Sequence, residues 1–109
     1  MVRLAFIHNI GIYSAHTNFD QVNDGTADVL AQVLNLQSCS PIVPTQAGLG
    51  YGRVGVLQPC LSLQELLEKI KSCLKPPKLI FSPTPDLNMS VEKIAVLGGS
   101  GAGFIQAVC

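Results

Sequence analysis

The sequence predicts a single α/β domain in which helices pack against a mixed β-sheet. Two kinds of apolar segment lead to this prediction: some repeat at helical spacing, and others are short and rich in β-branched residues. The two kinds alternate along the chain as far as residue 81 and are separated by glycine and proline, which is typical of α/β proteins. Since 109 residues is a common size for one domain, we expect residues 1–109 to form one domain or a fragment of one.

Three segments have the apolar spacing of amphipathic helices, namely residues 2–9, 27–34 and 63–74. The third has the clearest start, because Ser62 and Glu65 have the spacing of a capping box. The first begins almost at the start of the chain without a capping residue. We therefore expect that helix to begin upstream of the sequence.

Four short segments favour strands: residues 12–17, 53–57, 78–81 and 93–97. The last is almost continuously apolar, so we expect it to lie in the centre of the sheet. Residues 37–52 show no periodicity and are rich in Pro, Ser, Gly and Thr, which predicts a loop with one short extended piece.

The composition favours a protein that meets other protein chains. Apolar residues make up 48% of the sequence and charged residues 13%, which is well below the usual ~25%. The mean hydropathy of +0.39 is high for a small monomer, so part of the surface is expected to contact a second copy or another protein. The net charge is zero and the basic residues are scattered, which disfavours nucleic-acid binding.

The chain has neither a signal-peptide pattern nor an apolar run of 18 residues, so we expect a cytoplasmic protein without a membrane partner. The four cysteines form no CxxC pair, and this excludes the commonest redox and zinc motifs. Cys60, Cys73 and Cys109 have apolar neighbours and are predicted to be reduced core residues.

The first candidate site consists of His16 and Asp20, which follow a predicted strand. Ligands of α/β proteins gather at the carboxyl ends of strands, and imidazole and carboxylate groups both bind zinc, manganese or iron. The alternative is a polar cap at the end of the strand. Two ligands are also fewer than the three or four that hold a transition metal.

The second candidate is the glycine-rich segment 98–103, in which the backbone amides of Gly98, Gly99, Ser100 and Gly101 form a possible anion-binding loop. The segment is neither a P-loop nor a dinucleotide fingerprint, because it lacks the Gly-Lys-Ser/Thr ending and the third glycine is misplaced. The alternative is a tight turn between a strand and a helix. No serine or cysteine lies in the sequence context of a nucleophile, so the sequence predicts no catalytic residue.

Three segments resemble the Nif-three-like family. They are Ile-Tyr-Ser-Ala-His-Thr-Asn-Phe-Asp at 12–20, the glycine-arginine strand and following helix at 50–66, and the glycine-rich segment at 91–103. The family is named for NGG-one-interacting factor three, and its members are also called GTP cyclohydrolase I type two homologues. The resemblance covers most of the chain.

The resemblance implies an α/β fold, a two-metal site for zinc, manganese or iron, and a ring-shaped hexamer. In this family the metal ligands are a tandem histidine pair, the aspartate that ends a His-Thr-x-x-Asp motif, and a late histidine with a glutamate. Asp20 matches the aspartate, and His16 matches the histidine of the motif, which is a pocket residue or a support for a ligand. The other ligands would precede Met1 and follow Cys109, so the resemblance implies a partial copy.

The resemblance therefore implies a metal-binding protein that has no catalytic activity as this fragment. We do not expect the chain alone to hold two metals, because it offers one carboxylate and one imidazole of the expected set. The alternative is an active metal-dependent hydrolase that acts on a nucleotide-like substrate when the protein is full length. A third hypothesis is an anion-binding module built on residues 98–103.

Overall fold

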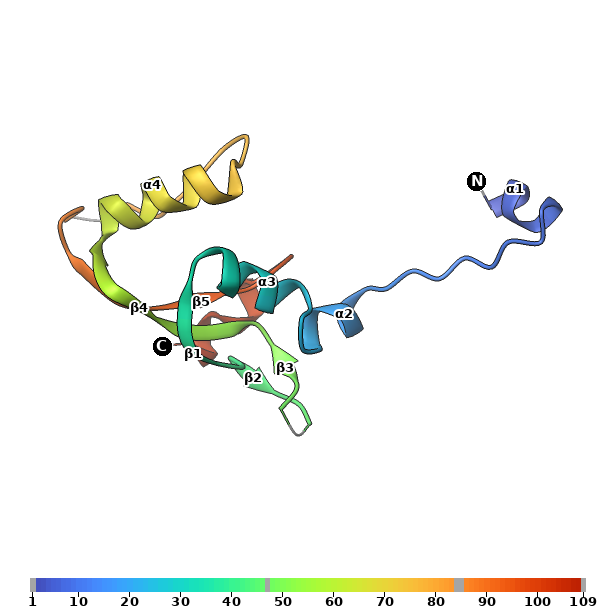
Figure 1. Ribbon diagram of the computed structural model, residues 1–109, viewed down its shortest axis with the longest axis horizontal. Helices are drawn as coiled ribbons and strands as arrows, with labels where there is room; N and C mark the ends of the chain where they lie inside the picture. The colour runs from blue at the N-terminus through green and yellow to red at the C-terminus, as the bar shows by residue number, and fades with distance from the viewer. Residues whose placement is uncertain (1, 47, 84–85, 109) are drawn as a thin grey trace.

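The computed structural model describes residues 2–46, 48–83 and 86–108 (Figure 1). The helices are α1 (Val2–Ile7), α2 (Thr17–Gln21), α3 (Thr26–Val33), α4 (Leu63–Leu74) and the 3₁₀ helix η1 (Ala102–Ala107). The strands are β1 (Leu36–Ser40), β2 (Val43–Pro44), β3 (Gly50–Tyr51), β4 (Arg53–Ser62) and β5 (Ser90–Val96). The expected α/β architecture is confirmed.

The main sheet has three strands in the order β1-β4-β5, and β2 and β3 form a separate hairpin. All pairings between the described strands are antiparallel. In the main sheet Leu36 lies opposite Leu57, and Gly55 lies opposite Ile94. The prediction that the strand at 93–97 is central was wrong, because β5 pairs only with β4 among the described strands and β4 occupies the centre.

The core lies between one face of the sheet and the helices α3 and α4. Its buried cluster consists of Ala31, Leu34, Leu36, Leu57 and Leu66. The predicted helix at 27–34 is confirmed, because Ala27 and Ala31 are its buried face and α3 packs beside β1 and β4. Close packing at β4 also explains why position 55 is a glycine, because a Cβ on Gly55 would lie 2.8 Å from the sulfur of Cys39.

The N-terminal arm, residues 2–15, extends away from this core. Figure 1 shows α1 at the far end of a long extended segment, well separated from the sheet. The radius of gyration is 17.1 Å, whereas roughly 13 Å is usual for a domain of this length. Helix α1 confirms the helical part of the prediction for residues 2–9, but none of its residues is buried and Phe6 is 87% exposed.

Two predicted strands are absent from the described structure. Residues 12–16 are exposed extended chain, because no described strand lies beside this part of the arm as a partner. Thr17 already belongs to α2. Residues 78–81 are irregular and lie between Pro76-Pro77 and Pro83, which supply no backbone donors for a sheet ladder.

The prediction of a loop at 37–52 was wrong in part, because this segment contains most of β1 and the β2–β3 hairpin. Only Leu36 of β1 is buried, so the strand lacks an apolar pattern. Cys60 and Cys73 are free but exposed, which contradicts their assignment to the core. Cys109 lies outside the described residues.

The predicted capping box at the start of α4 is present. The hydroxyl of Ser62 accepts a hydrogen bond from the backbone N–H of Glu65 at 3.2 Å. In return, the carboxylate of Glu65 accepts one from the backbone N–H of Ser62 at 2.7 Å. These bonds satisfy N–H groups that a helix leaves free at its first turn.

The Ser62→Ala variant is expected to lower the free energy of unfolding by about 1 kcal/mol at neutral pH, because it removes the side-chain cap. Hydrogen bonds from the backbone and side chain of Ser62 lower the pKa of Glu65. The stabilisation that comes from the hydrogen bonds to the ionised Glu65 carboxylate is therefore complete above the ordinary pKa of the carboxyl group. It is lost as the pH falls through the lowered pKa. Urea unfolding at a series of pH values should show that the difference in unfolding free energy between the variant and wild type shrinks on acidification. A difference that stays constant with pH would contradict the role of the Ser62–Glu65 bonds.

Candidate functional site

A pocket of about 320 Å³ lies where three parts of the chain meet. Helix α2 and the residue before it contribute one side, and Tyr51 of β3 contributes the second. The third side is the segment that follows β5, from Leu97 to Ser100, together with Phe104 of η1. The pocket contains most of the site residues predicted from the sequence.

His16 and Asp20 both line this pocket, as does Thr17 between them. His16 is the residue that precedes α2 and is exposed, whereas Asp20 is half-buried in the helix. The start of α2 thus places the imidazole and the carboxylate on the same pocket. The predicted neighbourhood is thus present, although it is built by a helix and not by a strand end.

The glycine-rich segment forms the side of the pocket next to Asp20. A Cβ on Gly98 would lie 2.8 Å from Cγ2 of Thr26 and 3.9 Å from Oδ1 of Asp20. Glycine at position 98 therefore lets the backbone approach the carboxylate and the start of α3. Gly98, Gly99 and Ser100 line the pocket, and Gly101, the fourth residue of the predicted loop, is not part of its lining.

An aromatic pair completes the pocket and was not predicted from the sequence. The rings of Tyr51 and Phe104 have their centroids 5.3 Å apart and are tilted by 39°. The hydroxyl of Tyr51 accepts a hydrogen bond of 2.9 Å from the side chain of Gln21. This bond links the β2–β3 hairpin to α2. The only signal in the sequence was a tyrosine between Gly50 and Gly52.

The second feature that sequence reasoning missed is Arg53, which is 4% exposed. Its guanidinium pairs with both carboxylate oxygens of Asp28, through Nε to Oδ1 and through Nη2 to Oδ2. Nη1 donates to the carbonyls of Gly50 and Gly52 at 2.9 and 2.7 Å, and Nη2 also donates to the carbonyl of Val22 at 3.5 Å. The available signal was a charged residue at the start of the strand predicted at 53–57, whose other residues are apolar.

The donor set near Asp20 falls short of a complete metal site. Within residues 2–46, 48–83 and 86–108, no group of three or more His, Cys, Asp or Glu side chains could hold a metal ion. Asp20 and His16 supply one carboxylate and one imidazole, whereas stable zinc binding uses three or four protein ligands. The described residues therefore do not fit a resident metal unless further ligands join them.

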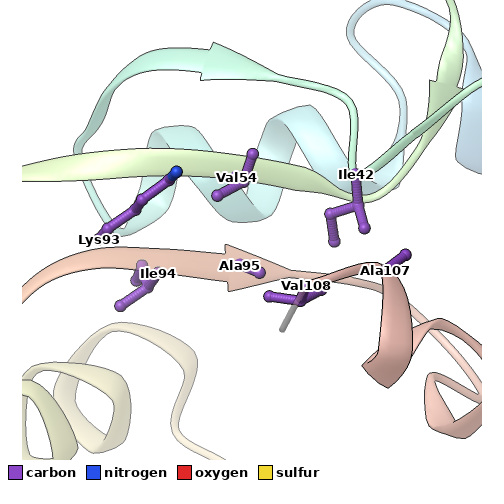
Figure 2. Close-up of a pocket in the computed structure, with 7 residues that line it drawn as sticks. All are labelled: Ile42, Val54, Lys93, Ile94, Ala95, Ala107 and Val108. Carbon is purple, nitrogen blue, oxygen red and sulfur yellow. The ribbon is translucent and has the colours of Figure 1, made fainter.

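A second pocket, of about 220 Å³, lies between β4, β5 and the end of η1 (Figure 2). Ile42, Val54, Ala95 and Val108 give it an apolar lining. Its one charged lining residue is Lys93, whose amine reaches toward β4 in Figure 2. With no acid or second polar group facing this amine in the lining, the pocket is a weaker candidate for chemistry than the one at Asp20.

The whole chain, residues 1–109, matches the family model described as Duf34/NIF3 (NGG1p interacting factor 3). The protein belongs to this family, as the three motifs in its sequence suggested. It is 71% identical over 108 residues to a GTP cyclohydrolase 1 type 2 homolog of Nostoc, covering 99% of this chain and 41% of that protein. NGG1-interacting factor 3 of Saccharomyces cerevisiae is 28% identical over 111 residues, with coverages of 91% and 38%.

The chain thus spans about two fifths of the length of these curated relatives. Solved structures support the same fold. A hypothetical protein of Staphylococcus aureus superimposes with a TM-score of 0.83 at 24% identity, covering 98% of this chain and 48% of that one. A Bacillus cereus protein related to NIF3 gives a TM-score of 0.80 at 18% identity, with coverages of 98% and 56%.

The helices of the described residues are short, and the longest, α4, has 12 residues. None of them combines the length and the apolar character that crossing a membrane requires.

Proposed function

We propose that Asp20 supplies one ligand of a divalent-metal site whose remaining ligands come from outside residues 1–109. The observation that carries this proposal is the shared pocket, in which the carboxylate of Asp20, the imidazole of His16 and the backbone at Gly98 lie together. Zinc, manganese and iron all accept carboxylate and imidazole ligands. His16 lines the pocket as a further ligand or as a hydrogen-bond partner of one.

On its own, the chain binds metal weakly and has no catalytic activity. Two side chains cannot fix the coordination geometry that a catalytic metal needs. The pocket contains the hydroxyl groups of Thr17 and Ser100, but no hydrogen bond in the described structure joins either of them to the imidazole of His16 as a base. The curated relatives are more than twice as long as the matched segment, so they have room for the missing ligands.

A second candidate function applies to a longer protein that contains this segment. It is a metal-dependent hydrolase acting on a nucleotide-like substrate, and the name of the Nostoc relative, GTP cyclohydrolase 1 type 2 homolog, favours it. Two features of the pocket suit such a ligand. Tyr51 and Phe104 offer ring surface for a base, and the backbone of Gly98–Ser100 offers N–H groups for an anion.

We also propose that the protein associates with itself, and a hexamer is the assembly that the family resemblance implies. The support is the apolar surface of the N-terminal arm, where Leu4, Phe6, Ile10 and Tyr13 are each at least 60% exposed. Exposed apolar clusters of this kind mark protein–protein contacts.

The Asp20→Asn variant tests the metal proposal in the chain itself. We expect Mn²⁺ to broaden the amide resonances of α2 and of residues 97–100 in wild type, because these groups surround the carboxylate. The variant should need about tenfold more Mn²⁺ for the same broadening, since a neutral amide is a weaker ligand.

Asp86→Asn is the matched control, because Asp86 is an exposed carboxylate that does not line the pocket. It should behave as wild type. Equal broadening in Asp20→Asn and wild type, or broadening centred on another carboxylate, would contradict the proposal. Repeating the titration with guanosine 5′-monophosphate tests the second candidate function, a hydrolase acting on a nucleotide-like substrate. That function requires additional chemical-shift changes in the resonances of Tyr51 and Phe104.

A further inference from the structure

Helix α2 carries Asp20 but has little apolar packing of its own. None of its five residues is buried, and Phe19 is 50% exposed. A short helix without a buried face is not stable alone, so other interactions must hold it against the sheet. The hydrogen bonds that join it to β3 and β4 lie at its C-terminal end, at Gln21 and Val22.

These polar contacts lead to Arg53. Its five N–H groups all have acceptors, which is the full capacity of a guanidinium. The acceptors belong to Val22 after α2, Asp28 in α3, and Gly50 and Gly52 on either side of Tyr51. One side chain thus connects the helix that carries Asp20 to the hairpin that carries Tyr51.

The Asp28 carboxylate extends this connection to the turn between α2 and α3. Its Oδ2 accepts a hydrogen bond of 2.8 Å from the backbone N–H of Asp24, which has a left-handed φ of 59°. Arg53 also lies opposite Val96 in the β4–β5 pairing, directly before the segment that contains Gly98. All three sides of the pocket are therefore linked to the Arg53–Asp28 pair.

We propose that Arg53 is a positioning residue for the Asp20 pocket. It acts by holding α2 in a fixed position beside Tyr51 and residues 97–100. This inference rests on the proposed function, because it gives the placement of Asp20 a role in binding. Lysine cannot replace arginine here, since an ammonium group has three donors and no planar fork for the Asp28 carboxylate. The alternative is that Arg53 stabilises the whole fold without a particular effect on the pocket.

The experiment compares wild type, Arg53→Lys and Leu66→Ala. Leu66 is a buried core residue of α4 outside the pocket, so its variant lowers the global stability without touching the Arg53–Asp28 pair. We expect Arg53→Lys to fold and to raise the Mn²⁺ concentration needed for broadening by about tenfold. Relative to wild type, we also expect Arg53→Lys to accelerate amide hydrogen exchange in α2 more than in α4. Leu66→Ala should leave the Mn²⁺ midpoint unchanged in the folded chain.

The proposal is overturned if Arg53→Lys matches Leu66→Ala in both the Mn²⁺ midpoint and the hydrogen exchange of α2, after both values are corrected for global stability. If wild type itself shows no Mn²⁺ broadening, the proposed metal function fails, and hydrogen exchange in α2 still decides the role of Arg53. If Arg53→Lys does not fold, Asp28→Asn takes its place, because it keeps the shape of the pair and removes the negative charge. Unchanged exchange in α2 in that variant also overturns the proposal.

Discussion

The Arg53→Met variant is expected to lower the free energy of unfolding by about 3–5 kcal/mol, because it breaks a buried ion pair from one side. The Asp28 side chain is 20% exposed and would keep its charge without the guanidinium. The carbonyls of Gly50 and Gly52 would lose their shared donor as well. Urea unfolding followed by circular dichroism measures this loss.

Arg3→Met is the control for this variant, since Arg3 is exposed on α1 and its replacement should change stability by less than about 0.5 kcal/mol. A loss below about 1 kcal/mol in Arg53→Met would show that the ion pair contributes little. The double variant Arg53→Met with Asp28→Leu should recover part of the stability, because it also removes the unpaired carboxylate.

The Leu57→Ala variant is expected to cost about 2–5 kcal/mol, which is the range for truncating a buried leucine. Leu57 is 2% exposed and lies in the central strand, where α3, α4 and β1 meet. Because a domain of this size has a total stability of roughly 5–15 kcal/mol, the variant should unfold at a much lower urea concentration.

Leu74→Ala provides the comparison, because Leu74 is also a leucine but is 39% exposed at the end of α4. Its loss should be less than half that of Leu57→Ala. Similar losses in the two variants would mean that the buried cluster around Leu57 is not the main source of stability.

The elements with a complete local signal were predictable from sequence. Ser62 and Glu65 mark the start of α4 through side-chain bonds between neighbours, so no distant contact is needed to place it. The apolar spacing of α3 is likewise a property of one segment. The strand at 53–57 was also predicted, because an apolar run follows Arg53. In the structure β4 continues further, to Ser62.

Elements that depend on a distant partner were not predictable. Residues 12–17 and 78–81 contain good strand formers, but a strand exists only where another strand accepts its hydrogen bonds, and neither segment has one in the described structure. The opposite error occurred at β1, where four polar or small residues form a strand because Leu36 and Gln37 pair with Leu57 and Val56.

The candidate site was predictable in its residues but not in its assembly. His16 with Asp20, and the glycines at 98–99, were selected as two separate candidate sites. They share one pocket because α2 folds against the segment after β5. Arg53 and Tyr51 were missed as site residues. Their roles depend on acceptors and donors that lie 25–31 positions away along the chain, and a local pattern cannot show these.

The most direct test of the account is the metal content of the purified 109-residue chain after desalting, measured together with the protein concentration. Because the chain offers one carboxylate and one imidazole at the pocket, we predict much less than one zinc, manganese or iron ion per chain. One or more tightly held ions per chain would contradict the claim that the site needs ligands from outside these residues.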